Sequence, residues 1–275
     1  MPEHIYKDVT DFEHNDYNMN SVGTGPYKLV DYQSGSYLKF EANENYYKGE
    51  PSVKNIVFQI IENADTAILA LQNGEVDAYQ MTPQQVKKLD LDASNLTAYS
   101  YTEGRVGYLQ INCNRVTDEN VRKALLFAMD RKAMDDAAFE SDEYYSIPYT
   151  FLPTNSQFYT EDGVEKYEQD VDKAKSMLEE AGVSGLKLKL GYISSDAVQS
   201  AQALLIQEQL KEVGVTVELA GGDGTAIANA MKDPDNEYDM YLGGYIMGID
   251  PDTFSSLFEN DGAYNYMHYS GYDTI

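Results

Sequence analysis

The regular alternation of helix and strand patterns after residue 170 constrains the fold of this chain more than any other feature. The predicted order is a helix over 171–181, a strand over 186–192, a helix over 197–213, a strand over 215–219, a short helix near 225–231 and a strand over 238–243. A strand, a crossover helix and a second strand in so short a span imply a right-handed parallel pair. This half of the sequence therefore predicts an α/β fold with an open sheet.

The part of the chain before residue 140 has a different character. It predicts a hairpin of strands 27–32 and 37–42 around Ser34-Gly35, a strand over 53–61, a helix that Asn63 or Asp65 caps and that stops at Asn73-Gly74, a strand over 107–112, and a helix that begins at Thr117-Asp118-Glu119. Residues 140–168, rich in tyrosine and proline, predict an irregular connection across a surface.

In open α/β sheets, ligands bind at the carboxyl ends of the strands. The predicted strands place these ends at residues 192–195, 220–223 and 244–247. The sequence therefore favours a binding site formed by these three segments.

Charge and composition exclude several classes of function. The chain carries 20 basic and 46 acidic residues, a formal net charge of −26, which disfavours nucleic acid or an anionic membrane surface as a partner. Hydrophobic residues make up 43% of the chain, too many for a disordered protein. Residues 1–107 carry a net charge of −8 and residues 108–275 a net charge of −18, so the excess suits neutral or cationic solutes.

Motifs for nucleophilic catalysis are weak. His4, His14 and His268 lie far apart in the sequence, Cys113 has no histidine near it, and there is no Gly-x-Ser-x-Gly motif. A pair such as Asp250 and Asp252 is expected by chance among 46 acids. The sequence therefore predicts no catalytic residues.

Motifs for metals and cofactors are equally weak. The acidic segment 233–237 resembles the opening of a calcium loop but lacks its glycine and its closing glutamate. The glycine-rich segment 221–225 follows a strand and precedes a helix, but no lysine follows it to hold a phosphate. An acidic turn, and a strand-to-helix turn capped by Thr225 or Asp223, are the simpler interpretations, and no metal or cofactor is predicted.

A set of ordered motifs resembles the family 5 solute-binding proteins of ABC importers, the relatives of oligopeptide-, dipeptide- and nickel-binding proteins. The matching segments are 23–29 (GTGPYKL), 43–49 (NENYYKG), 67–77 (AILALQNGEVD), 108–112 (YLQIN), 121–131 (VRKALLFAMDR), 151–153 (FLP), 174–182, 209–215 (QLKEVGV) and 250–252 (DPD). Together they span nearly the whole chain, so the resemblance is specific.

The resemblance implies a type II periplasmic-binding-protein-like α/β fold of two lobes joined by crossover strands. Residues 1–107 would then be part of lobe I, and residues 108–275 would be lobe II without its C-terminal part. Family chains are longer, with a signal segment and often a lipid-anchored cysteine. The sequence is thus expected to be an internal, incomplete part of such a protein.

The resemblance also implies a ligand-binding set: Tyr108, Asn112, Gly243, Gly244, Tyr245, Ile246, Met247 and Asn265. Backbone groups of 243–247 would pair with an extended peptide as an added strand. Met247 stands where the family places an aspartate against the peptide's amino terminus, and a thioether cannot form that charge-assisted bond.

The function implied is non-catalytic binding of a small solute, a peptide or similar oligomer, and its delivery to membrane permease subunits by a monomeric protein outside the cytoplasm. Two alternatives remain: the ligand-sensing region of a transcription regulator with the same fold, and a hydrolase. An upstream DNA-binding motif or turnover of a bound oligosaccharide would distinguish them.

Overall fold

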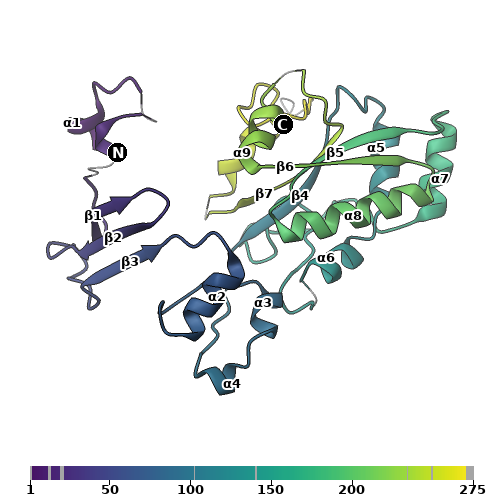
Figure 1. Ribbon diagram of the computed structural model, residues 1–275. Helices are drawn as coiled ribbons and strands as arrows, with labels where there is room; N and C mark the ends of the chain where they lie inside the picture. The colour runs from purple at the N-terminus through teal and green to yellow at the C-terminus, as the bar shows by residue number, and fades with distance from the viewer. Residues whose placement is uncertain are drawn as a thin grey trace. The chain divides into compact units, whose positions relative to one another are not determined.

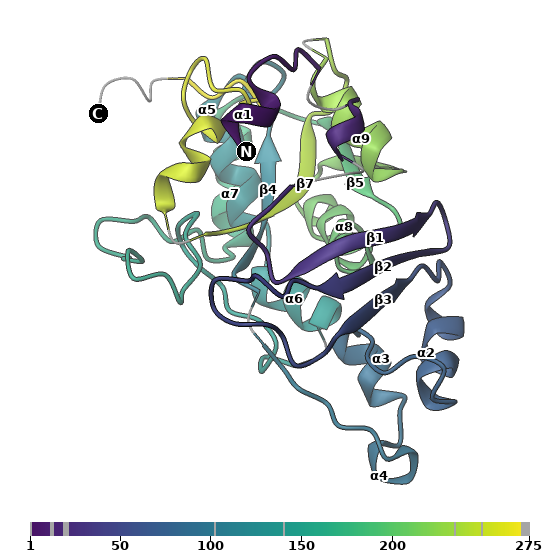
Figure 2. The ribbon, with the colours of Figure 1, turned by 90° about the vertical axis from the view of Figure 1, so that its left-hand side faces the viewer.

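The structure is a computed structural model that describes residues 2–270 apart from 12–13, 19–21, 102, 140, 234 and 249 (Figures 1 and 2). Pro234 of the acidic turn and residues 271–275 of the expected second lobe therefore lie outside the described residues. The chain forms two compact units, Met1–Gln80 and Met81–Ile275. The expected lobe boundary at Gly107 lies within the second unit, because β4 (Arg105–Ile111) pairs with β7 (Met240–Ile246) along its length.

The first unit is built on a three-stranded antiparallel sheet. Its elements are α1 (Glu3–Tyr6), η1 (Asp16–Asn18), β1 (Tyr27–Gln33), β2 (Tyr37–Ala42), β3 (Asn55–Gln59) and α2 (Ala64–Gln72). β1 and β2 form the predicted hairpin, in which Gln33 pairs with Tyr37 and Gly35 adopts a φ of 71°. Asn63 caps α2 by accepting the N–H of Thr66 at 2.9 Å, as predicted.

The second unit contains the larger sheet. Its elements are α3 (Pro83–Lys87), α4 (Leu91–Ser94), β4, α5 (Glu119–Phe127), α6 (Arg131–Phe139), α7 (Val171–Glu180), β5 (Lys187–Ile193), α8 (Ala197–Glu212), β6 (Thr216–Gly222), α9 (Gly224–Met231), β7 and η2 (Pro251–Leu257). Residues 141–168 contain neither helix nor strand, which confirms the predicted irregular connection.

The strand order in this sheet is β4-β7-β5-β6. β5 runs parallel to both β6 and β7, whereas β4 is antiparallel to β7. The predicted strand–helix–strand unit is thus confirmed as β5-α8-β6. Figure 1 shows α8 along one face of the sheet and α9 on the opposite face, so the sheet is covered on both sides.

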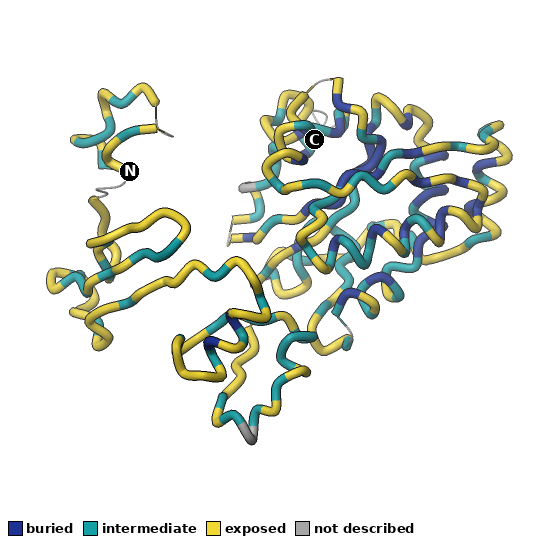
Figure 3. Tube along the Cα trace, viewed as in Figure 1, coloured by how far each residue is buried: buried dark blue, intermediate teal, exposed yellow. Residues whose placement is uncertain are grey.

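Two hydrophobic clusters fill these two faces. The larger cluster joins Leu190, Met240 and Leu242 of the strands to Ile206 and Leu210 of α8. The smaller cluster, on the other face, contains Ile227, Met231 and Met267 with tyrosines packed against it. In Figure 3 the buried positions concentrate in the sheet and helices of the second unit. Among the described helices, none has the length and apolarity needed to cross a bilayer.

Two strands extend further than the sequence predicts. β7 ends at Ile246 rather than Gly243, and β6 includes Gly221 and Gly222, which the sequence placed in a turn. The glycines mark close contacts within the sheet rather than loops. A Cβ added to Gly221 would lie 2.7 Å from Cζ of Tyr192.

Helix α9 begins immediately after β6. Asp223 caps it by accepting the N–H groups of Thr225 at 2.9 Å and Ala226 at 3.1 Å. Asp223 was one of the two caps that the sequence allowed. The segment is therefore a capped strand-to-helix turn.

Candidate functional site

At its carboxyl end, β7 is paired with a neighbouring strand along one edge but not along the other. β4 follows β7 along one edge from Met240 to Ile246. On the other edge, the pairs with β5 within the described residues are Leu190–Met240 and Gly191–Tyr241. Beyond Tyr241, β5 therefore no longer lines this edge of β7.

The hydrogen bonds at the two ends of the β4–β7 ladder fix the direction of its backbone groups. The N–H of Met247 donates to the carbonyl of Gly104 at 3.0 Å, and the N–H of Asn112 donates to the carbonyl of Asp239 at 2.9 Å. Hydrogen-bonded and non-hydrogen-bonded pairs alternate along an antiparallel ladder. The odd-numbered residues of β7 therefore direct their backbone groups to β4.

The even-numbered residues of β7 direct their backbone groups the other way. Gly244 and Ile246 thus present N–H and C=O groups at the edge that β5 leaves, which we call the free edge of β7. Both residues are exposed, Ile246 by 60%. Residues 244–247, predicted as the carboxyl end of this strand, therefore lie mostly within β7 and keep backbone groups available for pairing.

Side chains of Tyr108, Tyr245 and Met247 lie on the same face of the two strands. The ring centroids of Tyr108 and Tyr245 are 5.7 Å apart. Tyr108 crosses Gly243, where an added Cβ would lie 2.6 Å from Cε2 of the tyrosine. The structure therefore brings together most of the residues that the sequence predicted for binding.

Two residues that the sequence analysis did not include hold Tyr245 in place. Its hydroxyl donates to the carbonyl of Phe151, and its ring stacks on Phe254 with centroids 4.0 Å apart. Phe151 belongs to one of the matching motifs and Phe254 follows another, so proximity to these motifs is the sequence signal by which both could have been found. Burial raises the pKa of Tyr245 above its ordinary value, so its hydroxyl remains a neutral donor.

Tyr108 is also kept neutral. Burial, followed by the neighbouring Tyr241 and Tyr266, raises the pKa of Tyr108 to about 12. Tyr108 and Tyr245 together form an aromatic surface beside the free edge of β7, which we call the aromatic floor. Both hydroxyls are therefore uncharged at physiological pH. Such a surface suits contact with apolar parts of a ligand and with its amide groups.

Met247 marks the end of this floor and lines an open pocket of about 420 Å³. The pocket is lined by Glu103, Gly104, Pro153, Asn155, Ser156, Gln157, Met247 and Gly248. The side chain of Met247 is 9% exposed, so it forms part of the wall rather than projecting into solvent. The sequence analysis singled out Met247 but none of the other lining residues.

A charged pair lies on the other face of the same strands. Arg105 donates from Nη2 to Oδ2 of Asp196 at 3.2 Å. Asp196 also caps α8 by accepting the N–H groups of Val198 and Gln199. Half of the Arg105 side chain remains exposed, and its guanidinium lies over Gly244, where an added Cβ would be 3.4 Å from Nε of Arg105.

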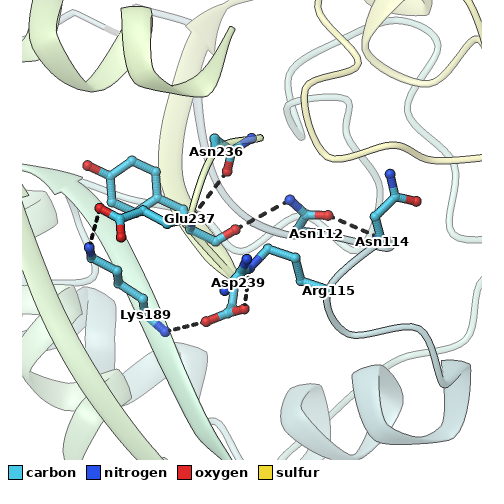
Figure 4. Close-up of polar contacts among 8 residues, drawn as sticks. Asn112, Asn114, Arg115, Lys189, Asn236, Glu237 and Asp239 are labelled. Carbon is cyan, nitrogen blue, oxygen red and sulfur yellow. Dashed lines mark hydrogen bonds and ion pairs between the residues drawn. The ribbon is translucent and has the colours of Figure 1, made fainter. Parts of the chain in front are cut away.

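Asn112 is not brought together with the other predicted residues. It follows the last residue of β4 and lies opposite Asp239, at the amino end of β7 (Figure 4). It is 2% exposed, its Nδ2 donates to the carbonyl of Tyr238 at 3.4 Å, and its Oδ1 accepts the N–H of Asn114 at 3.0 Å. These bonds tie neighbouring segments of the backbone together.

The same end of the sheet holds a buried carboxylate (Figure 4). Asp239 accepts from Nε of Arg115 and from the backbone N–H of Lys189, both at 2.7 Å. Nζ of Lys189 pairs with Glu237 at 2.6 Å. This network joins β4, β5 and β7 where the strand pairing begins.

Asn265 is likewise engaged with the backbone. Its Nδ2 donates to the carbonyls of Glu259 and Tyr269, both at 2.9 Å, and its Oδ1 accepts the N–H of Tyr269 at 2.9 Å. The side-chain amide of Asn265 has two donor and two acceptor positions, and three of these four are thus used inside the segment. The geometry gives it the task of shaping the chain after η2.

The described residues contain no group of three or more histidine, cysteine or acidic side chains placed to hold a metal ion. The acidic segment at 233–237 is used otherwise in its described part. Asp233 accepts the N–H of Asp235 at 3.0 Å, and Asn236 accepts that of Tyr238 at 3.2 Å. These contacts are those of a turn.

Comparison with known proteins places this geometry in context. Residues 1–266 match the family described as "Bacterial extracellular solute-binding proteins, family 5 Middle". The oligopeptide-binding protein AppA of Bacillus subtilis is 29% identical over 92% of this chain and 50% of its own length. The nickel-binding periplasmic protein of Escherichia coli is 27% identical over 77% of this chain and 44% of its own length.

Solved structures agree with the sequence comparisons. The ABC transporter substrate-binding protein CtaP of Listeria monocytogenes superposes with a TM-score of 0.84 and 38% identity, over 99% of this chain and 56% of that protein. AppA of Bacillus subtilis in complex with a nonapeptide superposes with a TM-score of 0.82 and 26% identity, over 99% of this chain and 58% of that one. The expected periplasmic-binding-protein-like fold is thereby confirmed.

The chain spans about half the length of the relatives that it matches. The family match nevertheless covers nearly all of it, and the structural likeness extends over both units. The chain belongs to the family 5 bacterial extracellular solute-binding proteins.

Proposed function

We propose that this chain is part of the non-catalytic solute-binding protein of an ABC importer, and that its solute is a peptide or similar small oligomer. The observation that carries the proposal is the free edge of β7. Gly244 and Ile246 offer backbone donors and acceptors there, with the spacing of a strand. An extended peptide satisfies such groups by adding a strand to the sheet.

The surroundings of the edge support a peptide as the solute. Tyr108 and Tyr245 supply a neutral aromatic floor, and Arg105 and Glu103 supply one charge of each sign near the two strands. Backbone pairing gives affinity for any sequence, while side pockets select among sequences. AppA, whose structure holds a nonapeptide, is one of the relatives with the same fold.

The proposed binding site contains Tyr108 and five more of the predicted residues. Gly243, Gly244, Tyr245, Ile246 and Met247 form or flank the proposed binding edge. Asn112 and Asn265 are assigned to the scaffold, because their side chains are occupied by backbone groups. We retain lobes at 1–107 and 108–275 as part of the proposal for the complete protein.

The remaining parts of the proposal follow from the family. The complete protein would act as a monomer outside the cytoplasm and would deliver its solute to membrane permease subunits. Relatives named for oligopeptides, dipeptides and nickel support solute binding as the shared task. Which of these ligand classes applies here is what the experiment must test.

Binding of short peptides to the complete protein, measured by isothermal titration calorimetry, tests the proposal. The probes are pentaalanine and pentaalanine derivatives with a single N-methylated amide at each position. If the peptide pairs as a strand, N-methylation should weaken binding at every second position, because alternate amides face β7. Equal tolerance of N-methylation everywhere, or no binding of any peptide, would contradict the proposal.

A variant of the edge provides the second test. Ile246→Pro removes an N–H group that faces away from β4, so the β4–β7 ladder should survive. We expect pentaalanine affinity to fall about 5- to 10-fold, the effect of one backbone hydrogen bond. Ile246→Ala, which shortens the side chain but keeps the N–H, is the matched control and should bind nearly as well as the unchanged protein.

A further inference from the structure

The irregular segment 141–168 is attached to helix α6. It contains neither helix nor strand, and connections of this length within compact domains usually serve a function. The hydroxyl of Tyr145 donates to Oδ1 of Asp136 at 2.5 Å, and Nη1 of Arg131 donates to the carbonyl of Pro148 at 3.2 Å. The first part of the segment is therefore fixed to this helix by side chains rather than by strand or helix pairing.

The ring of Tyr149 lies beside two cations. Cζ of Arg131 is 4.6 Å from the centroid of the ring, and Nζ of Lys166 is 4.4 Å from it. A cation within about 6 Å of an aromatic face is attracted by the quadrupole of the ring. We call these three residues the Tyr149 cluster. Because Arg131 begins α6 and Lys166 lies near the end of the irregular segment, one ring joins the helix to two distant parts of the connection.

Hydrogen bonds fix the backbone of Tyr149 as well as its ring. Lys166 forms an ion pair with Glu161, whose carboxylate also accepts the hydroxyl of Tyr159 at 2.8 Å. The hydroxyl oxygen of Tyr159 in turn accepts the backbone N–H of Tyr149 at 3.2 Å. These contacts form a closed circuit that begins and ends at Tyr149.

Phe151 connects the Tyr149 cluster to the aromatic floor. Its carbonyl accepts the hydroxyl of Tyr245, and its ring lies against Phe258 with the centroids 5.1 Å apart. Two residues of extended chain span at most about 7 Å, so Phe151 cannot move far while Tyr149 is held. The position of Tyr149 therefore constrains the carbonyl to which Tyr245 is bonded.

We propose that Tyr149 is a positioning residue for solute binding. Its ring, held by two cations, fixes the carbonyl of Phe151 where the hydroxyl of Tyr245 binds, and so fixes the aromatic floor. The inference rests on the proposed function, because the floor belongs to the proposed binding site. A floor that is ordered before the solute arrives loses less conformational freedom on binding, which favours affinity.

Carbon-13 NMR of the tyrosine Cζ atoms in the complete protein, without solute, tests the positioning role. The signal of Tyr245 is assigned by its absence in Tyr245→Phe. Tyr149→Leu replaces the aromatic ring by an aliphatic side chain and should shift the Tyr245 signal, because the hydroxyl loses its fixed acceptor. Lys166→Gln removes one of the two cations and should shift the signal less, in the same direction. Lys166→Gln also provides the test if Tyr149→Leu does not fold.

Lys173→Gln is the matched control. Nζ of Lys173 lies 3.6 Å from the ring centroid of Phe127, so this variant also removes a cation from an aromatic ring, but between α5 and α7. The Tyr245 signal should stay in place. A shift as large as that in Lys166→Gln would overturn the positioning role. So would an unmoved Tyr245 signal in Tyr149→Leu, or in Lys166→Gln if Tyr149→Leu does not fold.

A double-mutant cycle with pentaalanine, measured by calorimetry, tests how Tyr149 affects binding. Tyr149→Leu should weaken binding about 3- to 10-fold, the range expected for one cation–aromatic contact, and Tyr149→Phe, which keeps the ring, should recover most of the loss. In the Tyr245→Phe background, Tyr149→Leu should have little further effect, because no hydroxyl remains to be positioned. Additive losses would mean that Tyr149 acts by another route and would overturn the proposal.

The two experiments separate this inference from the proposed function. If the unchanged protein binds pentaalanine and Tyr149→Leu leaves both the Tyr245 signal and the affinity unchanged, the positioning role alone fails. If the unchanged protein binds no pentaalanine, the proposed function fails. The NMR signal of Tyr245 then still supports or overturns the role of Tyr149 in holding the aromatic floor.

Discussion

Tyr108 of β4 lies directly across the backbone of Gly243 on β7, so close that a Cβ at residue 243 would be 2.6 Å from the tyrosine ring. This contact explains why a glycine occupies the interior of a strand, where it is normally unfavourable. It also determines how closely the ring of Tyr108 lies to the backbone of β7, beside the free edge of β7.

Gly243→Ala should therefore force Tyr108 to move. We expect the free energy of unfolding to fall by about 1–3 kcal/mol, the usual cost of overpacking. Urea denaturation of the complete protein measures this loss. Gly248→Ala is the control, since a Cβ there meets no atom within 4 Å. A loss as large in the control, or none at Gly243, would contradict the steric explanation.

A test of coupling sharpens this point. The double variant Gly243→Ala, Tyr108→Ala should lose less free energy of unfolding than the two single variants lose together, because removing the ring of Tyr108 removes the clash. Strict additivity would show that the methyl group at residue 243 acts through another neighbour.

Asn112→Ala should reduce stability rather than ligand affinity. The substitution leaves the carbonyl of Tyr238 and the N–H of Asn114 without their side-chain partner, which costs about 1–3 kcal/mol in a buried site. Pentaalanine affinity should remain within about twofold of the unchanged protein, since the free edge of β7 lies at the other end of the sheet. A larger drop in affinity than in stability would return Asn112 to the binding site.

Asp239→Asn tests the network at the amino end of β7. The neutral amide keeps the shape of the side chain but weakens the bonds from Arg115 and the Lys189 backbone. We expect a loss of about 1–3 kcal/mol, because the buried carboxylate gives up charge-assisted hydrogen bonds while its partner Arg115 stays partly exposed to solvent. In a double-mutant cycle with Arg115→Ala, the effects should be non-additive. Independent effects would mean that the ion pair contributes nothing to stability.

Asp135→Asn should stabilise the protein at neutral pH. Burial between α6 and α8 raises the pKa of Asp135 to about 6, despite a hydrogen bond from Gln202. The folded state thus binds the proton more tightly than the unfolded state, so stability decreases as pH rises through the folded pKa. At pH 7 the charged carboxylate of Asp135 destabilises the folded state. Its replacement should raise the free energy of unfolding by about 1–2 kcal/mol after allowance for its partial exposure.

The pH dependence provides the control for that variant. At pH 4 Asp135 is already protonated in the folded state, so Asp135→Asn should have little effect. Urea midpoints at pH 4 and pH 7 measure the difference. An equal gain at both pH values would assign the effect to something other than the charge.

The sequence by itself determined the order of the elements. Hydrophobic periodicity located the helices and strands of the β5-α8-β6 unit, and short-range rules located caps such as Asn63 and Asp223, because these signals act between residues close together in the chain. The ordered motifs identified the family in the same way. The same motifs also indicate Tyr108 and residues 243–247 as binding residues.

Only the tertiary structure decided what those residues do. Whether Gly243 and Gly244 form a loop or a strand depends on β4, which is distant in the sequence, and so does the direction in which Gly244 and Ile246 present their backbone groups. Burial separated Asn112 and Asn265 from the binding edge, and folding brought Glu103 beside Met247. Local patterns contain no information about such pairs, since strand register and pocket walls arise from contacts between distant segments.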